Sequence, residues 1–125
     1  MTENICLMLT ESNTTNAYVR ALKLAATAVD LRQHTVLYLA GCWADYAQAG
    51  YLEKEEGNFR MFFPKGESIM DVFRHFQQDG GQIWVSAFNA ANWNLNKHPL
   101  AAGATLVDDR TLLTFLTQGT VVLNF

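Results

Sequence analysis

The stretch Ile5-Cys6-Leu7-Met8-Leu9 consists of five apolar residues in succession. An uninterrupted apolar run of this length is typical of a strand buried on both faces of a parallel sheet. After a polar break at residues 10–16, apolar residues recur from Ala17 to Val29 at the spacing of one helical face. The run from His34 to Ala40 repeats the buried-strand pattern, with β-branched and aromatic residues. The sequence therefore predicts a β-α-β unit at the start of the chain.

The segment that follows, residues 41–66, has no regular pattern and is longer than an ordinary connection in a compact domain. Within it, the sequence predicts a short helix over Trp43 to Leu52 and a solvated charge run at Glu53 to Glu56. An aromatic patch at Phe59 to Phe63 ends at Pro64. Because long irregular segments often carry function, we expect a functional or interfacial role for this part of the chain.

The rest of the chain again alternates between helical and strand patterns. We expect helices at Ser68 to Asp79 and from Asp108 or Asp109 to Leu116, strands at Ile83 to Ala87, Ala104 to Val107 and Thr120 to Phe125, and a loop rich in Asn and aromatic residues at residues 88–96. Strands that alternate with helices favour a parallel sheet covered by helices on both faces. The predicted fold class is α/β, a three-layer α/β/α sandwich with a mainly parallel five-stranded sheet.

The composition limits the class of protein. A chain of 125 residues, 50% of them hydrophobic, is long enough for one domain with a real core, so we predict a single domain over residues 1–125. The formal net charge of -3 provides no basic stripe for nucleic acid, and no run of about 18 apolar residues predicts a membrane span. The start, Met1 to Asn4, lacks the positive region of a signal peptide, so we expect a cytoplasmic protein. Its two cysteines, Cys6 and Cys42, are then expected to be reduced.

Ligands of open parallel sheets bind beyond the carboxyl ends of the strands, where loops and helix N-termini converge. This rule selects residues 10–16, 41–43, 86–93 and 108–109. The polar and aromatic side chains that we predict to bind a ligand lie in or near these segments: Ser12, Asn13, Thr14, Trp43, Ser86, Asn89, Asn92, Trp93 and His98.

Cys42 follows the second predicted strand directly and is the candidate catalytic residue. A thiol at the N-terminus of a helix is favoured as a thiolate by the helix dipole, which would make Cys42 a nucleophile. The alternative is an inert, partly buried thiol beside Trp43, and the lack of a visible basic partner favours this alternative. Cys6 lies inside a predicted buried strand, where packing is its expected role.

Other chemistry has weaker support in the sequence. The loop Ser12-Asn13-Thr14-Thr15 could hold an anion on its amides and hydroxyls, but it lacks the glycines of a phosphate loop, and ordinary helix capping explains it better. His34, His75 and His98 show no metal-site spacing between them, so we predict no metal and no cofactor. Ser86 lacks a nucleophile elbow, whereas His98 could reach the carboxyl ends of the strands as a general base.

Several strings, taken together, resemble the DsrE-like (DsrE/DsrF) family of small sulfur-relay proteins. They are the opening strand with its polar loop and Ala-rich helix, the segment Ser68 to Gly81 leading into Gln82-Ile83-Trp84-Val85, the strand Gly103-Ala104-Thr105-Leu106-Val107, and the ending Thr120-Val121-Val122-Leu123-Asn124-Phe125. The resemblance covers nearly the whole chain and is one of pattern and spacing.

The resemblance implies a five-stranded parallel α/β/α domain that assembles as a trimer or hexamer. It also implies, for some members, a persulfide carried on a cysteine after the third strand. The matching stretch here, Ser86-Ala87-Phe88-Asn89-Ala90, contains no cysteine, so this chain is expected to be a divergent member. Related subunits that lack the cysteine act as non-catalytic partners in hetero-oligomers.

Two functional hypotheses follow. The first, which we favour, is a cytoplasmic DsrE-like homo-oligomer, a non-catalytic binding or structural subunit that acts through the Asn/Trp loop and the aromatic patch. Its partners would be related subunits, a small molecule or a sulfur carrier. The second is a sulfurtransferase or persulfide carrier in which Cys42 is the acceptor thiol. Neither hypothesis involves nucleic acid or a membrane.

Overall fold

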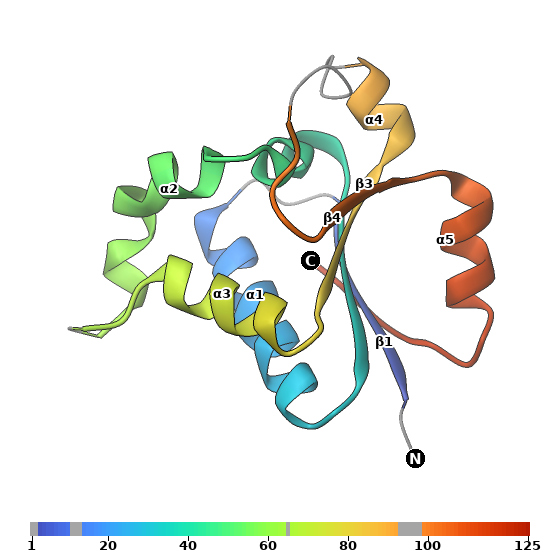
Figure 1. Cartoon of the computed structure of the whole chain (residues 1–125), viewed down its shortest axis with the longest axis horizontal. Coiled ribbons are helices and arrows are strands. Elements are labelled where there is room, and N and C mark those ends of the chain that lie inside the picture. Colours follow the sequence, from blue (N-terminus) through green and yellow to red (C-terminus); the bar gives the residue numbers. More distant parts are fainter. Residues whose placement is uncertain (1–2, 11–13, 65, 93–98) are drawn as a thin grey trace.

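The computed structural model describes residues 3–10, 14–64, 66–92 and 99–125 (Figure 1). All strand pairs are parallel, and the five-stranded sheet has the order β4-β3-β2-β1-β5. The strands are β1 (Asn4–Leu9), β2 (His34–Leu39), β3 (Gln82–Ser86), β4 (Ala104–Val107) and β5 (Val121–Asn124). The predicted α/β fold class and the five predicted strands are confirmed.

Helices cover the two faces of the sheet unequally. Helices α1 (Thr15–Asp30) and α3 (Ile69–Gln78) pack side by side on one face, and α5 (Asp109–Leu116) lies on the other (Figure 1). The chain steps from β1 to β4 in one direction across the sheet and then returns past β1 to β5. Because parallel crossovers are right-handed, a reversal of direction moves the connecting helix to the opposite face. This topology gives the three predicted layers.

The central strands β1 and β2 are buried on both sides, which explains their continuous apolar sequences. Leu7 and Leu37 are paired across the two strands and pack into the core under α1 and α3. Their neighbours Cys6 and Val36 point the other way, into a smaller core with Phe115 of α5. Successive side chains of a strand alternate between faces, so both faces of a central strand require apolar residues here.

The irregular segment after β2 differs from its prediction. The single helix expected over Trp43 to Leu52 is wrong: the structure has a 3₁₀ helix η1 (Gly41–Ala47), a short α2 (Tyr51–Glu55) and a second 3₁₀ helix η2 (Glu56–Phe62). Gly50 separates η1 from α2 with a φ of 83°, a left-handed conformation that ends regular helix and that glycine adopts most easily.

The segment after β3 also differs from its prediction. Residues 87–92 form the short helix α4 (Ala87–Asn92) in place of the expected loop. The hydroxyl of Ser86 accepts a hydrogen bond from the backbone N–H of Asn89 at 3.3 Å, which is the usual arrangement of a helix cap. After residues 93–98, the chain returns against η1, where Leu100 bridges Gln48 in antiparallel orientation.

Strand β5 is partly uncovered on both faces of the sheet. Its apolar residues Val121, Val122 and Leu123 are 45%, 43% and 39% exposed. Val122 pairs with Cys6 and so lies on the face that carries α5. Val121 and Leu123 lie on the face that carries α1. The expectation of a sheet covered on both faces therefore fails at this strand. Within the described residues, no helix combines the length and apolarity that spanning a membrane demands.

Candidate functional site

The ends of β1, β2 and β3 converge at the carboxyl end of the sheet, as the sequence predicts for a ligand site. The backbone N–H of Gly41, just after β2, donates a 3.0 Å hydrogen bond to Oδ1 of Asn89, just after β3. Gly41 has a φ of 60°, and a Cβ at this position would lie 3.4 Å from the carbonyl oxygen of Thr10, after β1. Glycine suits this position, where the three strand ends meet, because it has no Cβ and adopts a positive φ without strain.

Ser86 and Asn89 occupy the stretch where the family cysteine is expected. Ser86 is buried, and its Oγ accepts from the Asn89 N–H, while the Asn89 side chain accepts from Gly41. These hydrogen bonds thus join the segment after β3 to the segment after β2. Neither a serine elbow nor a thiol is present among residues 86–90.

An aromatic cluster made of Tyr18, Trp43, Tyr46 and Phe59 fills the space between the start of α1, η1 and η2. Tyr18 is stacked on Tyr46 with ring centroids 4.6 Å apart and on Trp43 at 5.8 Å, and Phe59 is 5.7 Å from Tyr18. Trp43 and Phe59 are buried, so the predicted ligand residue Trp43 is placed in the core of this cluster. The sequence analysis missed Tyr18 and Tyr46, although Tyr18 shares a helix face with Ala21, Leu22 and Ala25.

Two buried polar atoms of the aromatic cluster have no hydrogen-bond partner within the described part of the chain. They are the hydroxyl of Tyr18 and Nε1 of Trp43. Burial raises the pKa of Tyr18 above its ordinary value, and the nearby Tyr46 adds to the rise. A buried phenol of this kind remains neutral and is poorly suited to donate a proton in catalysis.

Cys42 is exposed on η1 beside this cluster, whereas Cys6 is buried in β1. Desolvation raises the pKa of the neighbouring Tyr46 to about 12, with further contributions from Tyr51, Glu55, Cys42 and Asp45. The charged groups in this set, Glu55 and Asp45, are acidic, so they oppose a negative charge on Tyr46. Cys42 itself is a solvent-accessible thiol at the carboxyl end of the sheet.

The remaining predicted site residues have structural roles or lie outside the described part. Thr14 caps α1, with its Oγ1 accepting from Ala17 N–H at 3.3 Å. Asp108 caps α5 by accepting from Thr111 N–H at 2.8 Å, and this bond lowers the pKa of its carboxyl group. Asn92 is the last residue of α4. Ser12, Asn13, Trp93 and His98 lie outside the described residues, so their predicted binding roles stay predictions.

Two surface hollows in the described part of the chain lie beside α3. One, between η2 and α3, is lined by residues that include Phe59, Arg60 and Phe63, and another lies between α2 and α3. Cys42, Ser86 and Asn89 line neither of these two hollows.

Comparison with solved structures identifies the fold. The crystal structure of the YchN protein from E. coli matches with a TM-score of 0.76 and 12% sequence identity over 99% of this chain and 100% of that one. A conserved protein of unknown function, BT1422 from Bacteroides thetaiotaomicron, matches with a TM-score of 0.57 and 12% identity over 96% of this chain and 94% of that one. No known family profile and no curated protein matches the sequence. The chain therefore has the YchN fold, the DsrE-like fold that the sequence predicts.

Proposed function

We propose that this protein is a cytoplasmic, non-catalytic binding or structural subunit of the DsrE-like type. One observation carries the proposal: the stretch after β3, where the family cysteine is expected, holds Ser86 and Asn89 in hydrogen bonds that tie strand ends together. Ser86 is buried behind its bond to Asn89, so it is a poor nucleophile, and the amide of Asn89 has no acid-base or transfer chemistry of its own. Ser86 and Asn89 would therefore stabilise the local structure and not take part in a reaction.

The proposal includes assembly into a homo-oligomer, a trimer or hexamer, with related subunits as further partners. Exposed apolar side chains support it, since such groups are enriched at interfaces. Phe88, on α4 at the candidate site, is 70% exposed, and Met61 of the aromatic patch is 83% exposed. Phe88 lies directly beside Ala87 and Asn89, so the interface and the candidate site would share one surface. A small molecule or a sulfur carrier would bind at this surface.

Size measurement and a Cys42 variant test the proposal together. Light scattering of the purified full chain is expected to give a trimer or hexamer, and Phe88→Asp is expected to shift it toward smaller species. The matched control is Leu113→Asp, another exposed apolar side chain, which lies on a different helix, α5. A monomer at micromolar concentration contradicts the assembly. Loss of cellular activity in an intact Cys42→Ser assembly contradicts the non-catalytic role.

A second candidate function is sulfur transfer on Cys42. Its support is that Cys42 is exposed at the carboxyl end of the sheet, next to the stretch that carries the family cysteine. In this reaction the Cys42 thiolate attacks the outer sulfur of a donor persulfide R–S–SH. The donor S–S bond breaks as a new S–S bond forms, the thiolate R–S⁻ leaves with the electron pair of the broken bond, and Cys42 becomes the persulfide Cys–S–SH with no net oxidation.

Mass spectrometry separates the two functions. The full chain is incubated with a small persulfide donor, and Cys42→Ser is treated in parallel as the control. Added mass of one sulfur atom on Cys42, absent from Cys42→Ser, supports the carrier. An unmodified Cys42 under conditions that load a free low-molecular-weight thiol excludes it and leaves the non-catalytic role.

A further inference from the structure

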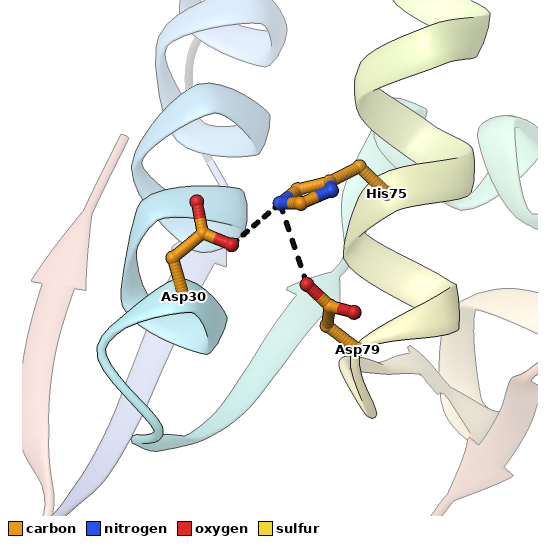
Figure 2. A group of neighbouring side chains, drawn as sticks. All are labelled: Asp30, His75 and Asp79. Atoms are coloured by element: carbon orange, nitrogen blue, oxygen red, sulfur yellow. Dashed lines mark hydrogen bonds and ion pairs between the residues drawn. The ribbon is translucent and has the colours of Figure 1, made fainter.

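Three side chains with metal-ligating atoms converge at the amino end of the sheet, away from the candidate site. Asp30 is the last residue of α1, while His75 and Asp79 lie in and just after the last turn of α3. Figure 2 shows both carboxylates directed at the imidazole of His75, whose Nε2 is 2.6 Å from Oδ1 of Asp30 and 3.4 Å from Oδ2 of Asp79. One ligand atom of each residue lies within 4.8 Å of the other two.

Helix geometry and packing explain this convergence. His75 and Asp79 are four residues apart, a spacing that places both on one face of α3. Asp30 arrives from α1, which packs side by side with α3. Both helices end just before a strand begins, β2 at His34 and β3 at Gln82, so the cluster lies beside the start of these two strands.

The local electrostatic potential favours a cation at this place. The C-terminus of a helix carries partial negative charge, and the ends of α1 and α3 meet here. The carboxylates of Asp30 and Asp79 add to that negative charge. In the described part of the chain, His75 is the ion-pair partner that the structure gives to both of them. Asp71, one turn earlier on α3, pairs with Arg74 and takes no part.

The surface beside the cluster has room for an ion and its water. A hollow is lined by Val29, Asp30, Arg32 and Asp79. Arg32 adopts a φ of 62°, and it brings one positive charge to the rim of the hollow. Within the described residues, its guanidinium makes no ion pair with either carboxylate, so it does not take the place of the proposed cation.

We propose that Asp30, His75 and Asp79 bind a divalent cation of the zinc class, namely Zn²⁺, Co²⁺ or Ni²⁺. One imidazole nitrogen and two carboxylate oxygens make a three-ligand set, and zinc sites with three protein ligands keep a further position for water. Ca²⁺ and Mg²⁺ prefer oxygen ligands alone, so the imidazole favours the zinc class. Bound zinc would join α1 to α3 and present one water to solvent in the hollow.

The present spacing of the ligand atoms suits this ion after small side-chain rotations. Bonds of 2.0–2.1 Å in a tetrahedral zinc site separate neighbouring ligand atoms by about 3.3 Å. The spacings here extend from 2.6 Å to no more than 4.8 Å, on both sides of that value. All three side chains are about half exposed, so they can rotate by this amount without disturbing the core.

Calorimetric titration of the chelator-treated full chain with Zn²⁺ tests the site. The titration is made in a Cys42→Ser background, because an exposed thiol is itself a zinc ligand. We expect one ion per chain, and His75→Ala, Asp30→Asn or Asp79→Asn should each weaken the affinity by about tenfold or more. His34→Ala is the matched control, because His34 is also exposed but pairs with Asn4, and it should leave binding unchanged.

Three results would overturn the proposal. The first is the absence of stoichiometric zinc binding. The second is a zinc affinity that survives His75→Ala, since the ion would then sit elsewhere. The third is Mg²⁺ binding as tight as Zn²⁺ binding, since the imidazole would then contribute nothing. A rise of the melting temperature with Zn²⁺ that is lost in Asp30→Asn supports the link between the two helices.

Discussion

The two ends of the sheet differ in how their polar groups are used. At the carboxyl end, the segments after β2 and β3 are joined by the Gly41–Asn89 hydrogen bond, and the aromatic cluster lies between α1, η1 and η2. At the amino end, Asp30, His75 and Asp79 meet with their side chains about half exposed. At the carboxyl end, where parallel-sheet proteins usually bind ligands, Ser86 and Asn89 are therefore occupied in hydrogen bonds within the fold, whereas the cluster at the amino end is open to solvent.

This difference separates the exposed thiol from the cluster that we propose to bind a cation. Cys42 is exposed at the carboxyl end. The three side chains of the proposed cation site lie at the amino end, with one ligand atom of each within 4.8 Å of the other two. Four experiments test the contrast between the two ends.

The largest effect is expected from Phe59→Ala. Phe59 is fully buried in the aromatic cluster, and removal of a buried phenyl ring leaves a cavity that costs about 3–5 kcal/mol of unfolding free energy. Leu113→Ala, at an exposed position on α5, should change it by less than about 0.5 kcal/mol. At the amino end, His75→Ala without metal should cost at most about 1 kcal/mol, because exposed ion pairs contribute little. Urea denaturation measures all three, and equal costs for Phe59→Ala and His75→Ala would remove the contrast.

The two cysteines should differ by about a hundredfold or more in their alkylation rates. Burial raises the pKa of Cys6 to about 12, so its reactive thiolate is scarce at pH 8, and the thiol is also shielded from the reagent. Cys42 is exposed at the carboxyl end. Iodoacetamide followed by mass spectrometry should find one label on the native chain, none on native Cys42→Ser and two on the denatured chain. Rapid labelling of Cys6 in the native protein would show that β1 is not a protected central strand.

Asn89→Ala should weaken the carboxyl end by about 1–2 kcal/mol, because the Gly41 N–H loses its acceptor in a partly buried place. Asn89→Asp is the matched control, since its carboxylate keeps an acceptor at the same point and should stay within about 0.5 kcal/mol of the native stability. Amide hydrogen exchange at Gly41 should accelerate in Asn89→Ala alone. Equal protection of Gly41 in both variants would mean that this hydrogen bond does not hold the strand ends together.

The smallest effect is expected from Tyr18→Phe, which removes a buried hydroxyl without a partner in the described structure. The unfolding free energy at pH 8 should rise by up to about 1 kcal/mol. The native chain should lose stability as the pH rises above 10, because burial raises the pKa of Tyr18 and the folded state therefore retains a proton that the unfolded state releases. Urea denaturation from pH 8 to pH 11 should show a shallower loss for Tyr18→Phe. An equal slope would assign the alkaline sensitivity to other groups.

Much of the fold could be predicted from the sequence, because its elements depend on local patterns. The continuous apolar runs predict β1 and β2, and the capping residues Ser68 and Asp108 mark the starts of α3 and α5. The helix expected over Trp43 to Leu52 was wrong because Gly50 adopts a left-handed conformation, which an apolar pattern does not reveal. The uncovered β5 was missed because its sequence resembles that of a buried strand.

The sequence predicted where the candidate site lies, but not how its side chains pack and hydrogen-bond. The rule for parallel sheets selected the segments that contain Cys42, Ser86 and Asn89. It could not predict that Ser86 and Asn89 are occupied in hydrogen bonds, or that Trp43 is buried under Tyr18 and Tyr46. The surroundings of Trp43 depend on α1 and η2, which are distant in sequence.

Local sequence patterns suffice to predict an α/β domain with alternating strands and helices, because hydrophobic periodicity and helix caps act over a few residues. The contacts between distant residues depend on how these elements pack in three dimensions. Gly41 and Asn89 are 48 positions apart, and Asp30 and His75 are 45 positions apart. Sheet order brings the first pair together, and the packing of α1 against α3 brings the second. Such long-range contacts depend on the packing of the whole domain, so no local sequence pattern predicts them.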